Sequence, residues 1–399
     1  MKKILLLGGS AQQIIAIETA KRLGFYTILC DFLNDNPGQY VADKFYLIST
    51  TDKEAVLAVA KKEKIEGILA YASDPAAPTA AYIAEKLNLP GNPFESVDIL
   101  CNKDKFRMFL RDNGYDIPIA KGYENAETAI NDVNGNTFSF PIIIKPVDSS
   151  GSKGITVLDS TENLEQAIEF AFSYSRGNRI IIEEFILKKH PYLIGGDIFV
   201  LNGKVIMWGL MNCHRDDKVN PLVPVGKSYP PQLMDEDLSR IKMTLQKLVK
   251  DLKIKSGSMN VELVVDKNNR VFPLDIGPRS GGNMIPDLLG KIFDVDIAEM
   301  SIKVAMGMKI NLEINDNNEY WATHNVHSRE NGMFDSVNYS DEVKPYIIKE
   351  CIYKQPGDKI EIFDNASKAV GIVFLKFNNS RDMDNILSNI SDKITVVLK

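Results

Sequence analysis

Strands and helices alternate through the first hundred residues, and this order allows few folds. Apolar runs with strand character are separated by amphipathic stretches with helical character. The strands are expected at residues 2–8, 26–32 and 67–73, and the helices at residues 12–23, 53–62 and 79–87. Because neighbouring parallel strands need a long crossover, usually a helix, the alternation predicts a Rossmann-like parallel α/β sheet.

The first strand of this sheet ends in a glycine pair. Gly8, Gly9 and Ser10 lead into a helix, and Asp31 ends the second strand, where a dinucleotide-binding fold has its ribose acid. The sequence GGSAQQ lacks the GxGxxG spacing, so we favour a tight strand–helix turn that could hold an anionic substrate at the helix N-terminus. An NAD-dependent dehydrogenase remains an alternative, although it leaves the motifs described below without a role.

Residues 257–283 predict a hairpin that sets two carboxylates side by side. MNVELVV and RVFPLDI both alternate, with Asn268–Asn269 as a two-residue turn between them. This register places Glu262 opposite Asp275 on one face. The other face carries Val261, Leu263, Val265, Phe272, Leu274 and Ile276. Two such carboxylates suit Mg²⁺, which leaves its other positions to water and phosphates, but the hairpin alone is equally typical of a solvated acid pair.

Between these regions lie a basic helix, a glycine-serine loop and further strands. The helix is expected at residues 102–113, and the apolar run IIIK ends in Lys145 before the loop VDSSGSKG. Backbone N–H groups and hydroxyls of such a loop can bind phosphates, but a lone loop of this kind is more typical of a simple turn. Further helices are predicted at residues 164–174, 236–252 and 284–308, and strands dominate beyond residue 309.

Composition limits the partners. A net charge of −6 and a pI near 5.5 argue against nucleic acid. No apolar run is long enough to span a membrane, and the run Ile4–Leu7 is too short for a signal peptide. The four cysteines and four histidines show no metal-ligand spacing. We therefore expect a cytoplasmic protein that binds neither nucleic acid nor membrane.

Four segments in one order resemble the ATP-grasp superfamily. They are NKDKFRMFLRDNGYDIP, FPIIIKPVDSSGSKGITVL, RIIIEEFI and GSMNVELVVDKNNRVFPLDIGPRSGGN. Within the superfamily, the chain is similar to the carboxylate–amine ligase branch, near the carbamoyl-phosphate synthetase, biotin carboxylase and phosphoribosylglycinamide synthetase relatives. The tail segments WATHNVHSREN and YKQPGDKIEIF are similar to C-terminal domains of those proteins.

The resemblance implies an α/β and α+β architecture in four parts. A Rossmann-like domain at residues 1–102 would precede the ATP-grasp fold. A small lobe with the glycine-rich loop would occupy residues 103–187, and a large lobe with the metal site residues 188–309. A strand-rich domain would follow at residues 310–399.

The resemblance also implies roles for single residues. Lys105 and Lys145 would hold ATP phosphates, and Glu183 would accept a hydrogen bond from the adenine amino group. Lys145 and Arg279 would act on the transferred phosphoryl group, and Arg215 is a weaker candidate for holding a carboxylate or oxyanion. Glu262 and Asp275 would bind Mg²⁺, or alternatively Mn²⁺. The remaining nucleotide contacts would come from Ser149, Ser150, Gly151, Ser152, Lys153, Gly154, Glu184, Phe185, Ile186 and Asp197.

The metal motif departs from the family pattern. Relatives have Glu-x-Asn-x-Arg, whereas this chain has Asp275-Ile276-Gly277-Pro278-Arg279, and a glycine offers no side-chain ligand. In the predicted register Asn260 lies opposite Gly277. We therefore hypothesise that the Asn260 amide takes the open ligand position, and that Asp197 is the nearest candidate for the ribose acid.

The function implied by the resemblance is an ATP-dependent ligase. A small-molecule carboxylate would be activated as an acyl phosphate and joined to an amine, with release of ADP and phosphate. Beside the dehydrogenase, two further alternatives remain. One is carbamoyl-phosphate-synthetase-like transfer to a small acid such as bicarbonate or formate, including direct phosphorylation, and the other is nucleotide binding without turnover. A homodimer is expected from the family alone.

Overall fold

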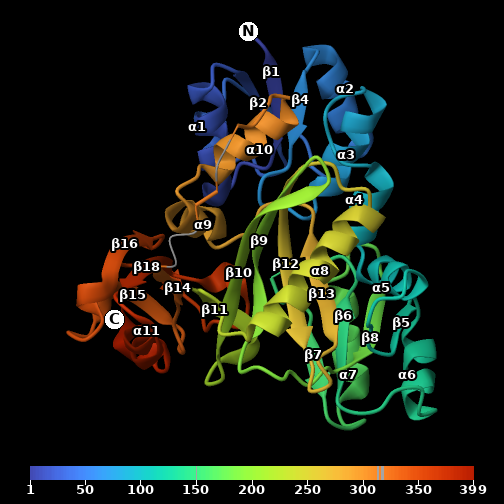
Figure 1. The fold of residues 1–399 in the computed structure, drawn as a ribbon, viewed down its shortest axis with the longest axis vertical. Coiled ribbons are helices and arrows are strands. Elements are labelled where there is room, and N and C mark those ends of the chain that lie inside the picture. Colours follow the sequence, from blue (N-terminus) through green and yellow to red (C-terminus); the bar gives the residue numbers. More distant parts are fainter. Residues whose placement is uncertain (150, 312–313, 316–318) are drawn as a thin grey trace.

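The computed structural model describes residues 1–149, 151–311, 314–315 and 319–399 (Figure 1). Ser150, one of the predicted loop residues, lies outside this set. Within the described residues the strands form four sheets. No described helix is both long and apolar enough to cross a membrane.

The N-terminal sheet is parallel, as its strand–helix alternation predicts. Its order is β3-β2-β1-β4, and all of its neighbouring strands run in the same direction. The strands are β1 (Lys3–Leu7), β2 (Tyr26–Asp31), β3 (Lys44–Leu47) and β4 (Gly67–Leu69), with helices α1 (Ile14–Arg22), α2 (Lys53–Glu63) and α3 (Ala77–Lys86) between or after them. Apolar side chains on both faces are buried, which places this sheet inside two cores.

A second sheet follows a pair of linking helices. These are α4 (Phe94–Leu100) and α5 (Lys103–Asp112). The sheet has the order β5-β8-β6-β7 with antiparallel pairing. Its elements are β5 (Ala120–Tyr123), α6 (Ala126–Asn134), β6 (Ile142–Pro146), β7 (Thr156–Leu158), α7 (Leu164–Ser173) and β8 (Ile180–Glu184). Helices α6 and α7 bury their apolar faces against it.

The largest sheet is antiparallel and has eight strands in the order β13-β12-β9-β10-β11-β14-β18-β16. Its first strands and covering helix are β9 (Leu193–Leu201), β10 (Lys204–Asp216), β11 (Asn220–Tyr229), α8 (Asp235–Asp251), β12 (Gly257–Val265) and β13 (Val271–Gly277). Helix α8 packs on one face through Ile241, Leu245 and Leu248. Helix α9 (Ile285–Phe293) covers part of the opposite face through Leu288, Leu289 and Ile292, and the rest of that face borders a cleft.

The C-terminal strands continue this sheet. Strand β14 pairs with β11 and with β18, so the sheet crosses the predicted boundary at residue 310 without a break in strand pairing. The elements of this region are β14 (Tyr320–Val326), β15 (Gly332–Tyr339), β16 (Ile347–Ile352), β17 (Lys359–Ile360), β18 (Gly371–Phe377), α11 (Ser380–Leu387), α12 (Ile390–Lys393) and β19 (Ile394–Leu398). A small sheet, β17-β15-β19, completes the region. Because strand pairing continues across residue 310, the sheet gives no break at that limit, and the predicted domain limits stay predictions.

The hairpin of β12 and β13 has the predicted register at its polar end but a different turn. Asn260 pairs with Gly277 and Glu262 with Asp275, whereas Val265 pairs with Val271 instead of Phe272. The connection is thus longer than two residues, and a β-bulge between Glu262 and Leu263 restores the register. As a result Val271 joins the apolar core and Leu274 turns to the cleft. The prediction that Phe272 and Leu274 fill the apolar face was wrong.

The predicted helix at residues 284–308 is two helices. These are α9 (Ile285–Phe293) and α10 (Ile297–Ala305), separated by Asp294 in the left-handed region at φ 53°. Helix α10 lies against the N-terminal sheet (Figure 1), and its Ile302 packs with Ile4 and Ile17 in one core. A helix from the middle of the chain therefore ties the first sheet to the largest one.

Candidate active site

A cleft of about 430 Å³ lies between the β5-β8-β6-β7 sheet and the face of the largest sheet opposite α8. Both charged and apolar side chains line it, as expected for a nucleotide site of this size. The charged lining residues include Lys103, Lys145, Glu183, Glu184, Arg215, Glu262 and Asp275. The apolar ones include Ile143, Ile155, Phe185, Ile186, Leu193, Leu222 and Leu274.

Glu262 and Asp275 lie side by side on the floor of this cleft, and each has its own cation. Glu262 Oε1 accepts a hydrogen bond from Arg215 Nη2 at 2.8 Å, and Asp275 Oδ2 lies 3.2 Å from Lys103 Nζ. Burial would raise the pKa of Asp275, but Lys103, Lys145 and Arg279 hold it below its ordinary value. Both carboxylates are therefore compensated by cations that come from separate elements.

Lys145 is held in place by a buried carboxylate. Its ammonium pairs with Glu183 Oε2, and Arg107 Nε donates to Glu183 Oε1 at 2.5 Å. Arg107 also donates to the carbonyl oxygens of Pro273 and Leu274. Although burial opposes ionisation, the two cations lower the pKa of Glu183 to about 2. The network thus fixes Lys145 at the cleft and joins α5 and β8 to the bulged strand β13.

This network corrects the predicted role of Glu183. Its side chain is only 2% exposed, and both oxygens are occupied by Arg107 and Lys145. Because the side chain is buried and each oxygen is directed at a cation, Glu183 faces Arg107 and Lys145 instead of an adenine amino group. Glu183 instead positions Lys145.

Lys105 does not lie where it was predicted. Lys105 pairs with Asp98 on the preceding helix, and the lysine that faces the cleft is Lys103. Lys103 Nζ also donates to the carbonyl oxygen of Ser149 at 3.0 Å, so it contacts both Asp275 and the glycine-serine loop. Helix phase is the cause, because Lys103 shares the buried face of Arg107 and Leu110, and Lys105 does not.

The described part of the predicted phosphate loop reaches the largest sheet. Ser152, in the left-handed region at φ 60°, lines the cleft, and its Oγ donates to the carbonyl oxygen of Leu222 at 3.0 Å. Gly154 also has positive φ and packs against Pro146 and Tyr174, where a Cβ would approach to 2.8 Å. Gly151 takes positive φ as well, and Lys153 forms no ion pair with the described residues. The loop thus closes one side of the cleft.

The segment after β8 offers a backbone donor. The N–H groups of Glu184 and Phe185 donate to Ile119 and Pro141, and the Glu184 carboxylate accepts from Ser139 N–H at 2.8 Å. Ile186 N–H has no protein acceptor within the described ranges. A free N–H beside apolar Phe185 and Ile186 is suited to one edge of a purine ring.

Asp197 and Asn260 bind each other away from the nucleotide side. Asn260 Nδ2 donates to Asp197 Oδ1 at 2.8 Å and to the Gly196 carbonyl oxygen at 3.0 Å, and Gly281 N–H donates to Asp197 Oδ2 at 2.7 Å. Asp197 is fully buried, which raises its pKa to about 6 despite these donors. Asp197 does not keep its predicted role as ribose acid, because it is fully buried and both of its oxygens accept from the protein. The Nδ2 of Asn260 is held by Asp197 and Gly196, and the hypothesis that its amide takes the open ligand position stays a prediction.

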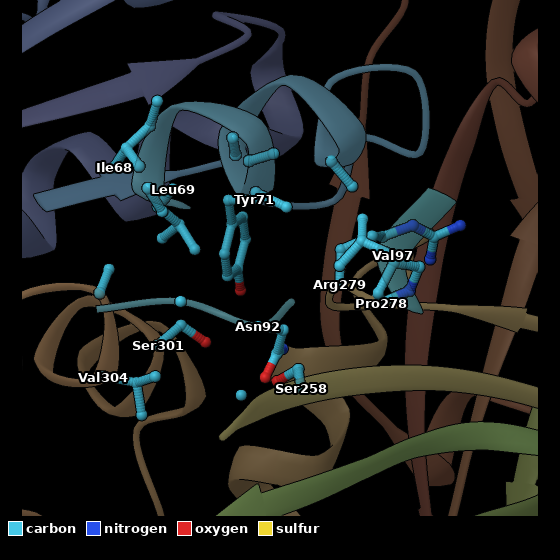
Figure 2. A pocket seen from close by; sticks show the side chains of 18 of the residues that line it. Ile68, Leu69, Tyr71, Asn92, Val97, Ser258, Pro278, Arg279, Ser301 and Val304 are labelled. Carbon is cyan, nitrogen blue, oxygen red and sulfur yellow. The ribbon is translucent and has the colours of Figure 1, made fainter. Parts of the chain in front are cut away.

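Arg279 lies at the rim of a second, smaller cavity of about 90 Å³ (Figure 2). Its Nε donates to Asp74 Oδ1 at 2.7 Å, and its Nη2 pairs with Asp74 Oδ2. Figure 2 shows the phenol oxygen of Tyr71 pointing into this cavity, near Ser258 and Ser301. Asp74 comes from the loop after β4, which the sequence placed among the loops that would hold substrates, but its contact with Arg279 was not predicted.

The glycine turn after β1 leaves no room for a dinucleotide. The Asp31 carboxylate accepts the N–H groups of Gly9 and Leu33 and is 6% exposed. A Cβ on Gly9 would lie 2.1 Å from Asn36 Oδ1, so that surface is covered by the protein itself. The tight-turn interpretation fits this arrangement, and the dehydrogenase alternative loses its ribose acid.

Comparison with known proteins supplies the family. A family model described as carbamoyl-phosphate synthase L chain, ATP binding domain, matches residues 102–313, more than half of the chain. The chain is 35% identical over 188 residues to the formate-dependent phosphoribosylglycinamide formyltransferase of Prochlorococcus marinus strain NATL2A, which covers 46% of this chain and 48% of that protein. It is 26% identical over 302 residues to the carbamoyl phosphate synthase large chain of Thermotoga petrophila, covering 72% and 26%. The chain thus spans about half or less of these relatives.

Solved structures show the same fold along the whole chain. An L-amino acid ligase from Bacillus licheniformis superposes with a TM-score of 0.82 at 20% identity and covers 100% of this chain and 99% of that one. A phosphoribosylglycinamide synthetase from Anaerococcus prevotii gives 0.76 at 20% identity, covering both chains fully. The fold is that of the ATP-grasp superfamily, as the sequence motifs predict. The chain belongs to the family of the carbamoyl-phosphate synthase L chain ATP-binding domain.

Proposed function

We propose that the protein is an ATP-dependent ligase that activates a small-molecule carboxylate as an acyl phosphate and joins it to an amine, releasing ADP and phosphate. The observation that carries the proposal is the pair Glu262 and Asp275, set opposite each other in a cleft of nucleotide size beside Lys103, Lys145 and Arg215. Carboxylates for a metal and cations for phosphates are the two requirements of phosphoryl transfer.

The donor set fits Mg²⁺. No group of three or more acidic, histidine or cysteine side chains with metal-binding geometry exists in the described part of the chain. Two carboxylates remain, which is what Mg²⁺ takes from a protein when phosphates and water complete its shell. Glu262 and Asp275 would hold the ion, and Mn²⁺ suits the same oxygen ligands. When bound, such an ion neutralises charge on the phosphate oxygens.

The cations then act on the phosphates. Lys145, held by Glu183, offers a fixed positive charge, and Lys103 and Arg215 lie beside the two carboxylates. Because these groups are already oriented, they stabilise the negative charge of the transferred phosphoryl group with little rearrangement. Ser152 and its loop cover the site, which keeps water from an acyl phosphate.

The two organic substrates need a separate site. A cavity of about 170 Å³ borders the turn after β1 and the loop after β4, and its lining includes Gln12, Tyr71, Gly281, Asp287 and Tyr353. In α/β proteins, ligands bind at the carboxyl ends of parallel strands, which is where this cavity lies. We assign it to the amine or the carboxylate substrate.

The proposal is tested by phosphate release from ATP and Mg²⁺ with a panel of carboxylate–amine pairs. We expect at least one pair to release ADP and phosphate, and Glu262→Ala to abolish that release. Activity that survives Glu262→Ala would contradict the assigned site. Lys105→Met is the matched control, because it removes a lysine that points away from the cleft.

A second candidate is activation of a smaller acid. The 35% identical relative is named as formate-dependent, so formate and bicarbonate belong in the panel, each with and without an amine. Gly277 favours a third candidate, nucleotide binding without turnover, and MgATP binding with no release for any pair would establish it. We also retain a cytoplasmic location, for which the four free thiols are suited, and a homodimer, which light scattering would measure.

A further inference from the structure

The space beside Gly277 is filled by another residue. A Cβ at position 277 would lie 2.8 Å from Asp74 Oδ1 and 3.1 Å from Arg279 Cζ. Gly277 is not among the glycines with positive φ, so its backbone does not require glycine. Glycine is instead required because a larger residue would not fit, and the group that occupies the space beside it is the Asp74 carboxylate.

Asp74 binds one edge of the Arg279 guanidinium. Nε and Nη2 both donate to this carboxylate, and Nη1 donates to the Ser280 carbonyl oxygen at 3.0 Å. A guanidinium has five N–H groups, so one on Nη1 and one on Nη2 remain. The bidentate contact fixes the plane of the guanidinium and therefore the direction of the two remaining donors.

Other carboxylates compete for Arg279. Asp197 and Asp275 both lie close enough to interact with its charge. The Arg279 side chain is 13% exposed and that of Asp74 21%, so water screens these interactions only in part. Without Asp74, the guanidinium would turn toward Asp275 or Asp197, and its remaining N–H groups would point in a different direction.

We propose that Asp74 is a positioning residue for Arg279, and that Gly277 is its necessary counterpart. A side chain at position 277 would push the Asp74 carboxylate away from the guanidinium, because its Cβ alone would lie 2.8 Å from Asp74 Oδ1. The loop after β4 thus sets the direction in which Arg279 offers N–H groups to a phosphoryl or acyl oxygen. This inference rests on the proposed function, which gives Arg279 an oxyanion to bind.

The test is a double-mutant cycle with Asp74→Ser, Gly277→Asn and the double variant. Inorganic phosphate is the probe, titrated calorimetrically into the MgADP-loaded protein, where it stands in for the transferred group. We expect Asp74→Ser to weaken phosphate binding about tenfold and MgADP binding less than twofold. Gly277→Asn should cause a similar loss, because it displaces Asp74. The double variant should be no worse than the poorer single one, since both changes break one contact.

Two further variants define the outcome. Asp74→Glu keeps the charge and should restore part of the lost affinity. Asp296→Asn weakens a different ion pair, that between Asp296 at the start of α10 and Arg22 of α1, and should leave phosphate binding unchanged. The proposal is overturned if wild type loaded with MgADP binds no phosphate, or if Asp74→Ser binds phosphate as tightly as wild type. It is also overturned if the loss of phosphate affinity in the double variant equals the product of the losses in the two single variants. Failure of wild type to bind MgADP would instead remove the proposed function.

Discussion

Glu262 and Asp275 are cross-strand partners, and each is neutralised by a cation from a different element, Arg215 of β10 and Lys103 of α5. Two carboxylates facing each other across a strand pair repel unless cations compensate them. Under the proposed function, a metal ion held by the two carboxylates would leave Arg215 and Lys103 to bind phosphate oxygens. The cleft therefore brings together charges that are suited to the metal–nucleotide complex of the proposed function.

Replacement of Glu262 by glutamine tests this arrangement. The change keeps the size of the side chain and removes one of two anionic metal ligands, so we expect MgADP affinity to fall at least tenfold. Calorimetric titration of MgADP measures the loss. Glu319→Gln, which alters an ion pair with Lys376 on a distant strand, should leave the affinity unchanged. Equal affinities for Glu262→Gln and wild type would exclude Glu262 as a metal ligand.

Lys103 and Lys105 form a matched pair on one helix. Both variants to methionine remove one positive charge, but Lys103 faces Asp275 and Lys105 faces Asp98. We expect Lys103→Met to lower ATP affinity tenfold or more, and Lys105→Met to change it less than twofold. Displacement of a fluorescent ATP analogue compares the two directly. The reverse order of effects would restore the role that the sequence motif gave to Lys105.

Glu183 should govern acid stability. Its pKa is about 2 in the folded protein and near 4.5 in the unfolded chain, so its contribution is present above pH 4.5 and is lost as the pH falls toward 2. Glu183→Gln leaves Arg107 and Lys145 buried without a counter-ion, and we expect a loss of about 3 to 5 kcal/mol at pH 7. Urea unfolding between pH 3 and pH 7 measures both effects. Glu184→Gln is the neighbouring control, and a pH-independent difference from wild type would contradict the assignment.

Asp197 should change the stability of the protein with pH in the direction opposite to that of Glu183. Burial raises its pKa from 3.8 to about 6, so its contribution to stability is complete below pH 3.8 and is lost as the pH rises through 6. The amide of Asp197→Asn does not titrate in this range, so the variant should not show this loss of stability as the pH rises. Urea midpoints of wild type and variant, measured from pH 4 to pH 7.5, should diverge across the window. Parallel profiles would show that Asp197 keeps an ordinary pKa.

Side-chain alternation correctly predicted which residues of β12 and β13 pair at the polar end of the hairpin. The pairing of Glu262 with Asp275 agreed with the prediction although the turn was longer, because a β-bulge beside Glu262 restored the register. The Asp266 carboxylate stabilises that longer turn by accepting the N–H groups of Asn268 and Arg270. Bulges depend on tertiary contacts such as those of Arg107 with Pro273 and Leu274, which alternation cannot reveal.

Other parts of the site differ in how far a sequence can reveal them. Helix phase could have separated Lys103 from Lys105, since Phe106, Arg107 and Leu110 mark the buried face. The contact of Asp74 with Arg279 spans 205 positions, and no local pattern carries it. Glu183 resembles an exposed strand end in sequence, and only the packing of α5 shows that it is buried.

The pairing of β11 with β14 has a consequence for dissection of the protein. Removal of the chain from residue 310 onward would leave β11 with an unpaired row of N–H and C=O groups at Gly226–Tyr229. Such an open edge recruits other chains, so the isolated ATP-grasp portion should aggregate unless this edge is covered. The C-terminal strands thus cover an edge of the largest sheet that would otherwise be open to other chains.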